Sequence, residues 1–155
     1  MKTKFLSLGR ALRVLVLVPA LACFLGSATA RADTRSDTLK AIHMVENPRD
    51  LIQAGPAGEL GAYQFRRETW AMHTTRPLRE ALVRAYSDEV ALAHYEWLRA
   101  GLKRNGLEVT SYNIALAWNA GLSAAVKGRA PRAAKFYAER VNNLASELAS
   151  HVAAT

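Results

Sequence analysis

Residues 39–48 read LKAIHMVENP, and this stretch determines the type of fold expected for the chain. Leu39, Ile42 and Val45 recur at helical spacing, so they place an apolar stripe along one side of a helix. The Asn-Pro pair that follows disfavours helical geometry at the asparagine, because a proline restricts the residue before it. The pattern therefore predicts a helix that packs its apolar face inward and ends near Glu46.

The rest of the chain shows similar helical patterns and no sustained alternation of the kind that indicates strands. We therefore expect a mainly α-helical, compact single domain of about six or seven helices, with at most a small β-hairpin in the loop at 47–61. The expected elements are a loose arm at 31–35, a first helix capped by Ser36 or Asp37, a short helix at 65–72, a helix at 78–86 opened by Pro77, a longer helix at 88–104 capped by Ser87, a helix capped by Thr110 or Ser111 and closed by Gly121, a short piece at 122–127, and a last helix opened by Pro131. Side chains expected in the core include Trp70, Trp97, Phe136, Tyr137, Val141, Leu144 and Leu148.

The first 30 residues are typical of an export signal rather than of a folded domain. A basic start precedes an apolar run at 14–25, and Ala28-Thr29-Ala30 supplies the small residues that suit signal cleavage. The run is shorter than the roughly 20 apolar residues of a membrane helix. The alternatives to a cleaved signal are a retained N-terminal anchor and a lipid anchor at Cys23. Cleavage leaves residues 31–155 as one domain without cysteine, exported to the periplasm or cell envelope.

Glu46 is followed by two short motifs and a late tyrosine in a fixed order. Gly61-Ala62-Tyr63-Gln64 comes first, Ala117-Trp118-Asn119 follows far downstream, and Tyr137 lies in the predicted last helix. In the order and spacing of these motifs, the chain resembles the lytic transglycosylase (SLT-type) domain of the lysozyme-like superfamily. In that family a catalytic glutamate at a helix end is followed by Gly-Leu-Met-Gln, then Ala-Tyr-Asn, then a tyrosine.

The chain departs from the family pattern at a few positions: Asn47 replaces the serine after the glutamate, Ala62 and Tyr63 replace leucine and methionine, and Trp118 replaces a tyrosine. The resemblance implies a lysozyme-like fold and cleavage of the MurNAc-GlcNAc β-1,4 bond of peptidoglycan. The products would carry 1,6-anhydro-MurNAc ends, and Glu46 alone would serve as acid and base, without a cofactor or metal. The substrate-binding residues implied by the resemblance are Asn47, Tyr63, Gln64, Trp118, Asn119 and Tyr137.

The residues themselves support part of this interpretation. A carboxyl group at the end of an apolar helix is partly desolvated, which raises its pKa and allows it to act as a general acid. The alternative is that Glu46 is an ordinary solvated residue at a helix end. The amides of Gln64 and Asn119 offer donors and acceptors to sugar groups, although each is also suited to a helix end.

Other chemistries lack a pattern in this sequence. His43 lies one turn before Glu46, but no second pair at ligand spacing completes a metal site, and His73, His94 and His151 are expected at the surface or in packing. The part after the signal has no cysteine and no Gly-x-Ser-x-Gly elbow for a nucleophile.

The charge is basic but modest. The net charge of +8 falls to +4 once the signal with its four basic residues is removed. That balance suits the anionic peptides of peptidoglycan, whereas a nucleic-acid partner is not expected for an exported protein. The basic cluster that either forms a solvated face or steers the glycan comprises Lys127, Arg129, Arg132 and Lys135.

Two alternatives to the transglycosylase stay open. A lysozyme-type muramidase would use the same acid with Asp50 or Glu59 as the base that activates water. A non-catalytic peptidoglycan-binding protein would keep the groove without the reaction. Glycan strands are the expected partner in every case; a cell-envelope protein partner is left open, and a monomer is expected.

Overall fold

The computed structural model describes residues 27–153, with side chains described for 35–152. Most of the proposed signal peptide lies outside this part of the chain. The structure is mainly α-helical, and the prediction of this fold class is confirmed. Its elements are α1 (Ser27–Glu46), α2 (Arg67–Ala71), the 3-10 helix η1 (Leu78–Leu82), α3 (Arg84–Arg104), α4 (Ser111–Ala120), α5 (Leu122–Val126) and α6 (Arg132–Ala153).

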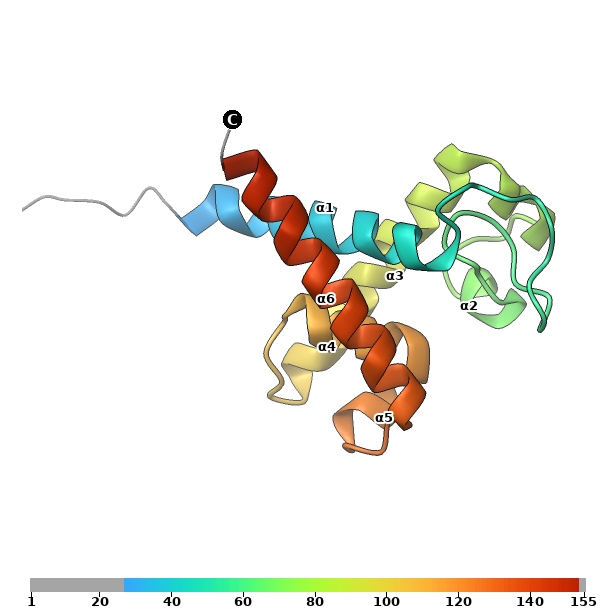
Figure 1. Ribbon diagram of the computed structural model, residues 1–155. Coiled ribbons are helices and arrows are strands. Elements are labelled where there is room, and N and C mark those ends of the chain that lie inside the picture. Colours follow the sequence, from blue (N-terminus) through green and yellow to red (C-terminus); the bar gives the residue numbers. More distant parts are fainter. Residues whose placement is uncertain (1–26, 154–155) are drawn as a thin grey trace, which may run out of the picture.

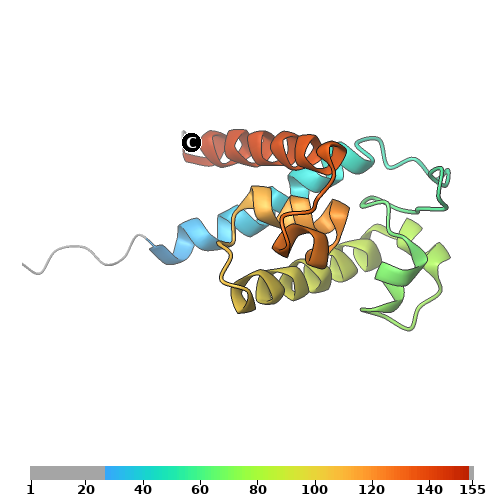
Figure 2. The ribbon, with the colours of Figure 1, turned by 90° about the horizontal axis from the view of Figure 1, so that it is seen from below.

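Helix α4 is the centre of the molecule, with α6 and α1 on one side and α3 on the other (Figure 2). Residues 47–83, with α2 and η1, form a lobe at the C-terminal end of α1 (Figure 1). The face of α6 that packs inward carries Ala134, Ala138, Val141 and Ala145 at helical spacing, all 4% exposed or less. Small side chains let helix backbones approach closely, so the core is built from alanines with a few larger residues such as Ile42, Leu98 and Ile114.

Helix α1 is longer than the sequence predicts. Residues 31–35 were expected to form a loose arm but belong to the helix, which begins at Ser27. No glycine or proline interrupts residues 27–46, and Arg35 pairs with Glu96 of α3 at 3.1 Å. Ser36 and Asp37 are therefore interior residues of α1, and the predicted cap at this point is wrong.

The chain between α2 and α3 also differs from the prediction. Pro77 does precede a helix, but this helix is the 3-10 turn η1 and ends at Leu82. Val83 is extended, with φ −83° and ψ 112°, so α3 begins at Arg84. Ser87, predicted to cap this helix, instead lies in its first turn, fully buried.

Two large side chains expected in the core lie at the surface: Trp97 is 38% exposed and Phe136 is 54% exposed. Trp70 is buried as predicted. The described residues contain no β-strand; Leu60 and Phe65 form one isolated antiparallel bridge. Within 27–153 no helix has the length and hydropathy to span a bilayer.

Candidate active site

A cleft of about 490 Å³ opens where the end of α1, the loop before α2 and the end of α4 meet. Glu46 enters it from α1, Tyr63 and Gln64 from the loop, and Trp118 and Asn119 from α4. Five of the seven residues predicted for the site thus line one cavity, although they come from three separate parts of the chain. Its size falls in the range of ligand-binding clefts.

A tight turn at Gly61 positions the loop side of the cleft. Gly61 has φ +80°, and a Cβ at this position would collide with the carbonyl oxygen of Ala81 in η1. The Gly61 carbonyl accepts hydrogen bonds from the backbone amide of Gln64 at 3.1 Å and from its side-chain Nε2 at 3.0 Å. These contacts explain why the motif needs glycine at its first position and an amide at its last. The Gln64 Oε1 atom makes no hydrogen bond within the described residues.

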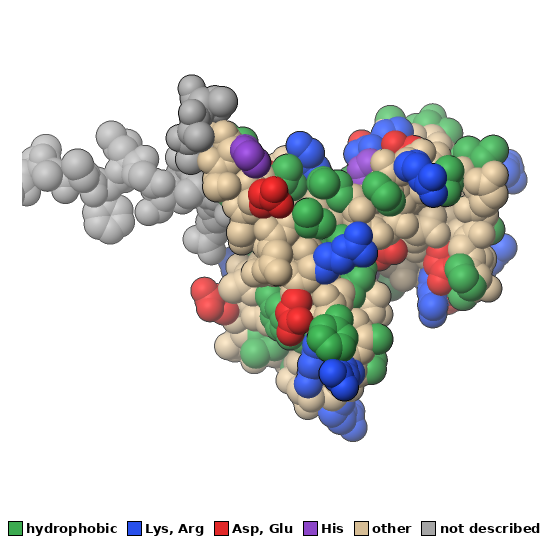
Figure 3. Space-filling model, viewed as in Figure 1, with side chains coloured by type: hydrophobic (Ala, Val, Ile, Leu, Met, Phe, Trp, Pro, Cys, Tyr) green, Lys and Arg blue, Asp and Glu red, His purple; other side chains and the backbone are tan. Residues whose placement is uncertain are grey.

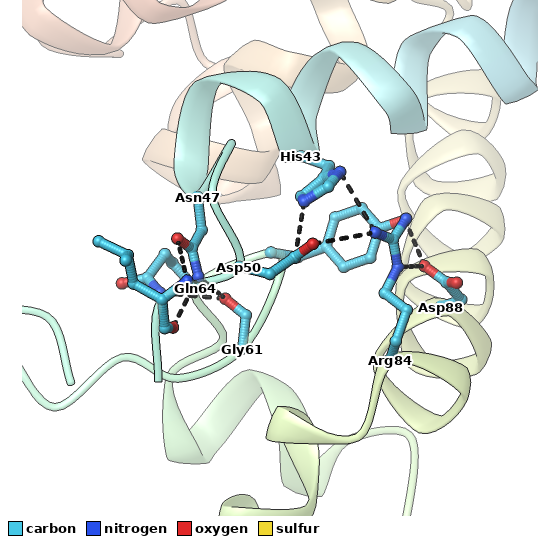
Figure 4. A network of polar contacts seen from close by, with 9 residues as sticks. His43, Asn47, Asp50, Gly61, Gln64, Arg84 and Asp88 are labelled. Atoms are coloured by element: carbon cyan, nitrogen blue, oxygen red, sulfur yellow. Dashed lines mark hydrogen bonds and ion pairs between the residues drawn. The ribbon is translucent and has the colours of Figure 1, made fainter. Parts of the chain in front are cut away.

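Asn47 is one of the two predicted site residues that do not line the cleft. It is 5% exposed and does not line the cleft. Its Oδ1 accepts from the Leu51 amide at 2.9 Å, while Nδ2 donates to the carbonyls of Leu51 at 2.9 Å and Gly61 at 3.3 Å (Figure 4). Asn47 therefore joins the chain that leaves α1 to the turn at Gly61, and its amide has no group directed at a substrate.

Glu46 receives a hydrogen bond from a residue that does not itself line the cleft. The Tyr137 hydroxyl of α6 donates to Glu46 Oε1 at 2.7 Å, so Tyr137, predicted to bind substrate, contacts the candidate acid instead of lining the cleft. Burial raises the pKa of the Glu46 carboxyl; the Tyr137 hydrogen bond partly offsets this, and the nearby charge of Glu59 adds to it. With Oε1 occupied by Tyr137, a proton on Glu46 resides on Oε2.

The aromatic residues of the site pack on one another. Trp118 lies 6.1 Å from Tyr63 and 5.7 Å from Phe65 between ring centroids, and is half-buried. Tyr63 is only 4% exposed, so it forms part of the floor of the cleft rather than an open surface for a sugar ring. Asn119 is exposed on the rim of the cleft, and its side chain makes no hydrogen bond within the described residues.

The hydroxyl of Tyr63 belongs to a hydrogen-bond network of charged residues. Its hydroxyl donates to Asp88 at 2.8 Å, and Arg84 donates to the same Asp88 oxygen at 2.8 Å. Figure 4 shows Arg84 also directed at His43 and Asp50, which lie 2.8 Å apart. Asp50, one of the two candidate bases, is committed to this network and does not line the cleft.

Glu59 is the candidate base that does line the cleft. Hydrogen bonds from its own backbone amide, from the Ala57 amide at 2.8 Å and from Arg66 at 3.2 Å lower its pKa. Glu59 is therefore a carboxylate at neutral pH, whereas Glu46 holds its proton more strongly. The cleft thus contains two carboxyl groups whose surroundings shift their pKa values in opposite directions.

His94 is a cleft residue that the sequence reasoning assigned to the surface or to packing. It is 6% exposed and lies on the buried face of α3, one turn from both Val90 and Leu98. The sequence did offer one indication that His94 is special: it is a histidine within an apolar stripe. A buried imidazole needs a polar partner, so such a position is unusual.

Another hollow, of about 530 Å³, lies over α1 and α6, beside Met44 and Phe136, and contains none of the predicted site residues. The described side chains contain no cluster of three or more metal-ligating groups. Comparisons with protein-family models, curated proteins and solved structures found no match to this chain.

Proposed function

We propose that the protein is a peptidoglycan lytic transglycosylase with a lysozyme-like fold, acting in the periplasm or cell envelope. The observation that carries the proposal is the hydrogen bond from Tyr137 to Glu46 at 2.7 Å, made beside a cleft that also holds Gln64, Trp118 and Asn119. A buried carboxyl with a raised pKa, fixed by one hydroxyl and open to a cleft, suits a general acid. The motif order that suggested the family adds independent support.

In the proposed reaction, Glu46 donates its Oε2 proton to the glycosidic oxygen between MurNAc and GlcNAc, and the bond to the MurNAc anomeric carbon breaks. The positive charge that develops is carried by the oxocarbenium ion or by the substrate's own N-acetyl group. Glu46, now a carboxylate held by Tyr137, accepts the proton of the MurNAc 6-hydroxyl. That oxygen attacks the anomeric carbon and closes the 1,6-anhydro ring, so no water is consumed.

The surface charge is compatible with this substrate. The basic cluster Lys127, Arg129, Arg132 and Lys135 is exposed throughout. In Figure 3, Lys and Arg side chains gather at the end of the molecule that carries α5. Such a surface attracts the carboxylates of peptidoglycan peptides over about 10 Å at moderate salt.

A muramidase reaction is the second candidate, and Glu59 is the observation that favours it. A carboxylate in the same cleft as a carboxyl group with a raised pKa is the arrangement that activates water in two-carboxylate glycosidases. Asp50, the other base considered, lies outside the cleft and is not retained.

The test is mass spectrometry of the products formed from purified peptidoglycan by the wild type, Glu46→Gln and Glu59→Gln. The transglycosylase predicts 1,6-anhydro ends, their loss in Glu46→Gln, and their persistence in Glu59→Gln. Reducing ends one water heavier, lost in both variants, would instead identify a muramidase. If the wild type and Glu46→Gln bind the glycan equally well and neither cleaves it, both reactions are contradicted. The remaining hypothesis would then be a non-catalytic peptidoglycan-binding protein.

A further inference from the structure

His94 is the buried titratable group in the cleft to which the proposed reaction gives no role. Its Nδ1 lies 2.9 Å from Nε2 of His73. Its other nitrogen, Nε2, makes no hydrogen bond within the described residues, and it is not among their fully buried polar atoms that lack a partner. His94 is one of the residues that line the cleft. Of its two ring nitrogens, Nε2 is the one left to meet a ligand there.

The orientation of the His94 ring is fixed from three sides. It stacks on Trp97 with centroids 5.6 Å apart and planes 12° from parallel. It meets Trp118 edge-on at 4.8 Å and 71°, and His73 closes the third side. A polar atom held this firmly is pre-organised for a ligand, because little side-chain entropy is lost on binding.

Both rings of the pair are neutral at neutral pH. Burial lowers the pKa of His94 to about 4, with the neighbouring His73 adding to the effect, and burial also lowers the pKa of His73. One ring proton therefore lies in the hydrogen bond between the two rings. If His73 donates it, His94 Nε2 carries a proton and is a donor; if His94 donates it, Nε2 is an acceptor.

We infer that His94 is a substrate-binding residue whose Nε2 contacts a sugar hydroxyl of the glycan, and that His73 is a positioning residue that sets the tautomer of His94. A hydroxyl both donates and accepts, so it matches either tautomer. Trp118, whose ring contacts His94, lines the same cleft and offers apolar surface beside this contact. The inference rests on the proposed function, since it takes the same glycan as ligand and adds one contact to it.

The experiment is a titration of the purified protein with tetra-N-acetylchitotetraose, a GlcNAc tetramer, followed through the ¹⁵N signals of the histidine rings. We expect the Nε2 signal of His94 to move on binding, while that of the exposed His151 stays in place. His94→Leu should raise the Kd by about three- to tenfold, the cost of one hydrogen bond. His94→Gln, whose amide reaches a similar position, should recover most of that loss.

The positioning role of His73 has its own signature. His73→Phe should change the tautomer populations of His94, read from the ¹⁵N shifts of its two nitrogens, before any glycan is added. A tautomer unchanged by this substitution would overturn the role of His73. Because the spectra of the wild type report the contact directly, the test holds even where a His94 variant folds poorly.

The outcomes separate this inference from the function on which it rests. If the wild type binds the tetramer but the His94 signal does not move and His94→Leu keeps full affinity, the inference fails alone. If the wild type binds neither the tetramer nor peptidoglycan, the proposed function fails and takes the inference with it.

Discussion

The pKa of Glu46 is set by its burial and by two groups from other parts of the chain, Glu59 and Tyr137. Burial at the end of α1 and the charge of Glu59 favour the protonated form, and the Tyr137 hydroxyl favours the carboxylate. The balance matters because the same carboxyl must release a proton in one step and accept one in the next. A carboxyl shifted in one direction alone would perform only one of these steps well.

Replacing Tyr137 with phenylalanine should expose this balance. The substitution removes the one hydrogen bond that lowers the pKa of Glu46, so the alkaline limb of the pH–rate profile should move to higher pH. The rate at the optimum should fall by about tenfold to a hundredfold, because Glu46 loses the contact that orients it. The measurement is kcat/KM for glycan cleavage against pH. Tyr112→Phe on α4 is the control, and an unmoved alkaline limb in Tyr137→Phe would contradict the tuning role.

The sequence located those site residues whose role depends on a local motif. Gln64 and Asn119 were predicted from the motifs at 61–64 and 117–119, and both line the cleft. Asn47 was predicted to bind substrate because it takes the position of the family's serine, whereas its side-chain amide donates to two backbone carbonyls. His94 was missed because its partners, His73 and Trp118, come from other elements of the fold.

At the scale of elements, the start of α3 contains a buried polar group that the described fold does not satisfy. The Ser87 hydroxyl is buried and has no hydrogen-bond partner among the described residues. Sequence alone suggested a cap here, since a serine before a helical pattern is the usual signal. The same reasoning was right at Thr110, whose side chain accepts from the Asn113 amide at 3.1 Å. The two positions differ because the extended residue before α3 is Val83, so α3 begins three residues before Ser87. No local sequence pattern predicted this earlier start.

Ser87→Ala should therefore stabilise the protein. Removing an unpaired buried hydroxyl, with a gain in helix propensity, should raise the free energy of unfolding by about 1 kcal/mol. Urea denaturation of the two proteins measures this difference. Ser146→Ala on the exposed face of α6 serves as control and should change stability by a few tenths of a kcal/mol at most. A loss of stability in Ser87→Ala would show that the hydroxyl is satisfied, for example by a buried water.

At the scale of the whole molecule, periodicity predicted the helical class, but it did not predict the arrangement. The central place of α4 depends on close packing of alanines from α1, α4 and α6, and alanine gives almost no periodic signal on its own. Trp97 and Phe136 show the converse limit. Their size and spacing suggested core positions, yet Trp97 is partly exposed and stacks on His94, and Phe136 is exposed with the Arg132 guanidinium over its ring.

The site and the stability of the whole fold are coupled through Glu46. Because burial raises its pKa, the folded protein holds this proton at pH values where the unfolded chain has lost it. Stability contributed by the raised pKa is fully present at low pH and is lost as the pH rises from the ordinary value of 4.5 through the folded value. His94 and His73 act in the opposite sense: their lowered pKa values make the fold less stable as the pH falls below 6.5.

Glu46→Gln isolates the first of these effects, because both proteins keep the two histidines. The glutamine side chain carries no charge and can still accept from Tyr137, so the variant should be more stable than the wild type at pH 8, by about 1 kcal/mol, the usual size of a single stabilising substitution. The advantage should shrink as the pH falls and disappear below about pH 4, where the wild-type carboxyl is mostly protonated in both the folded and the unfolded state. Urea denaturation at several pH values gives the difference curve, with the exposed Glu139→Gln on α6 as control. A difference that does not vary with pH would mean that Glu46 ionises as an ordinary surface carboxylate, and the general-acid role would lose its physical basis.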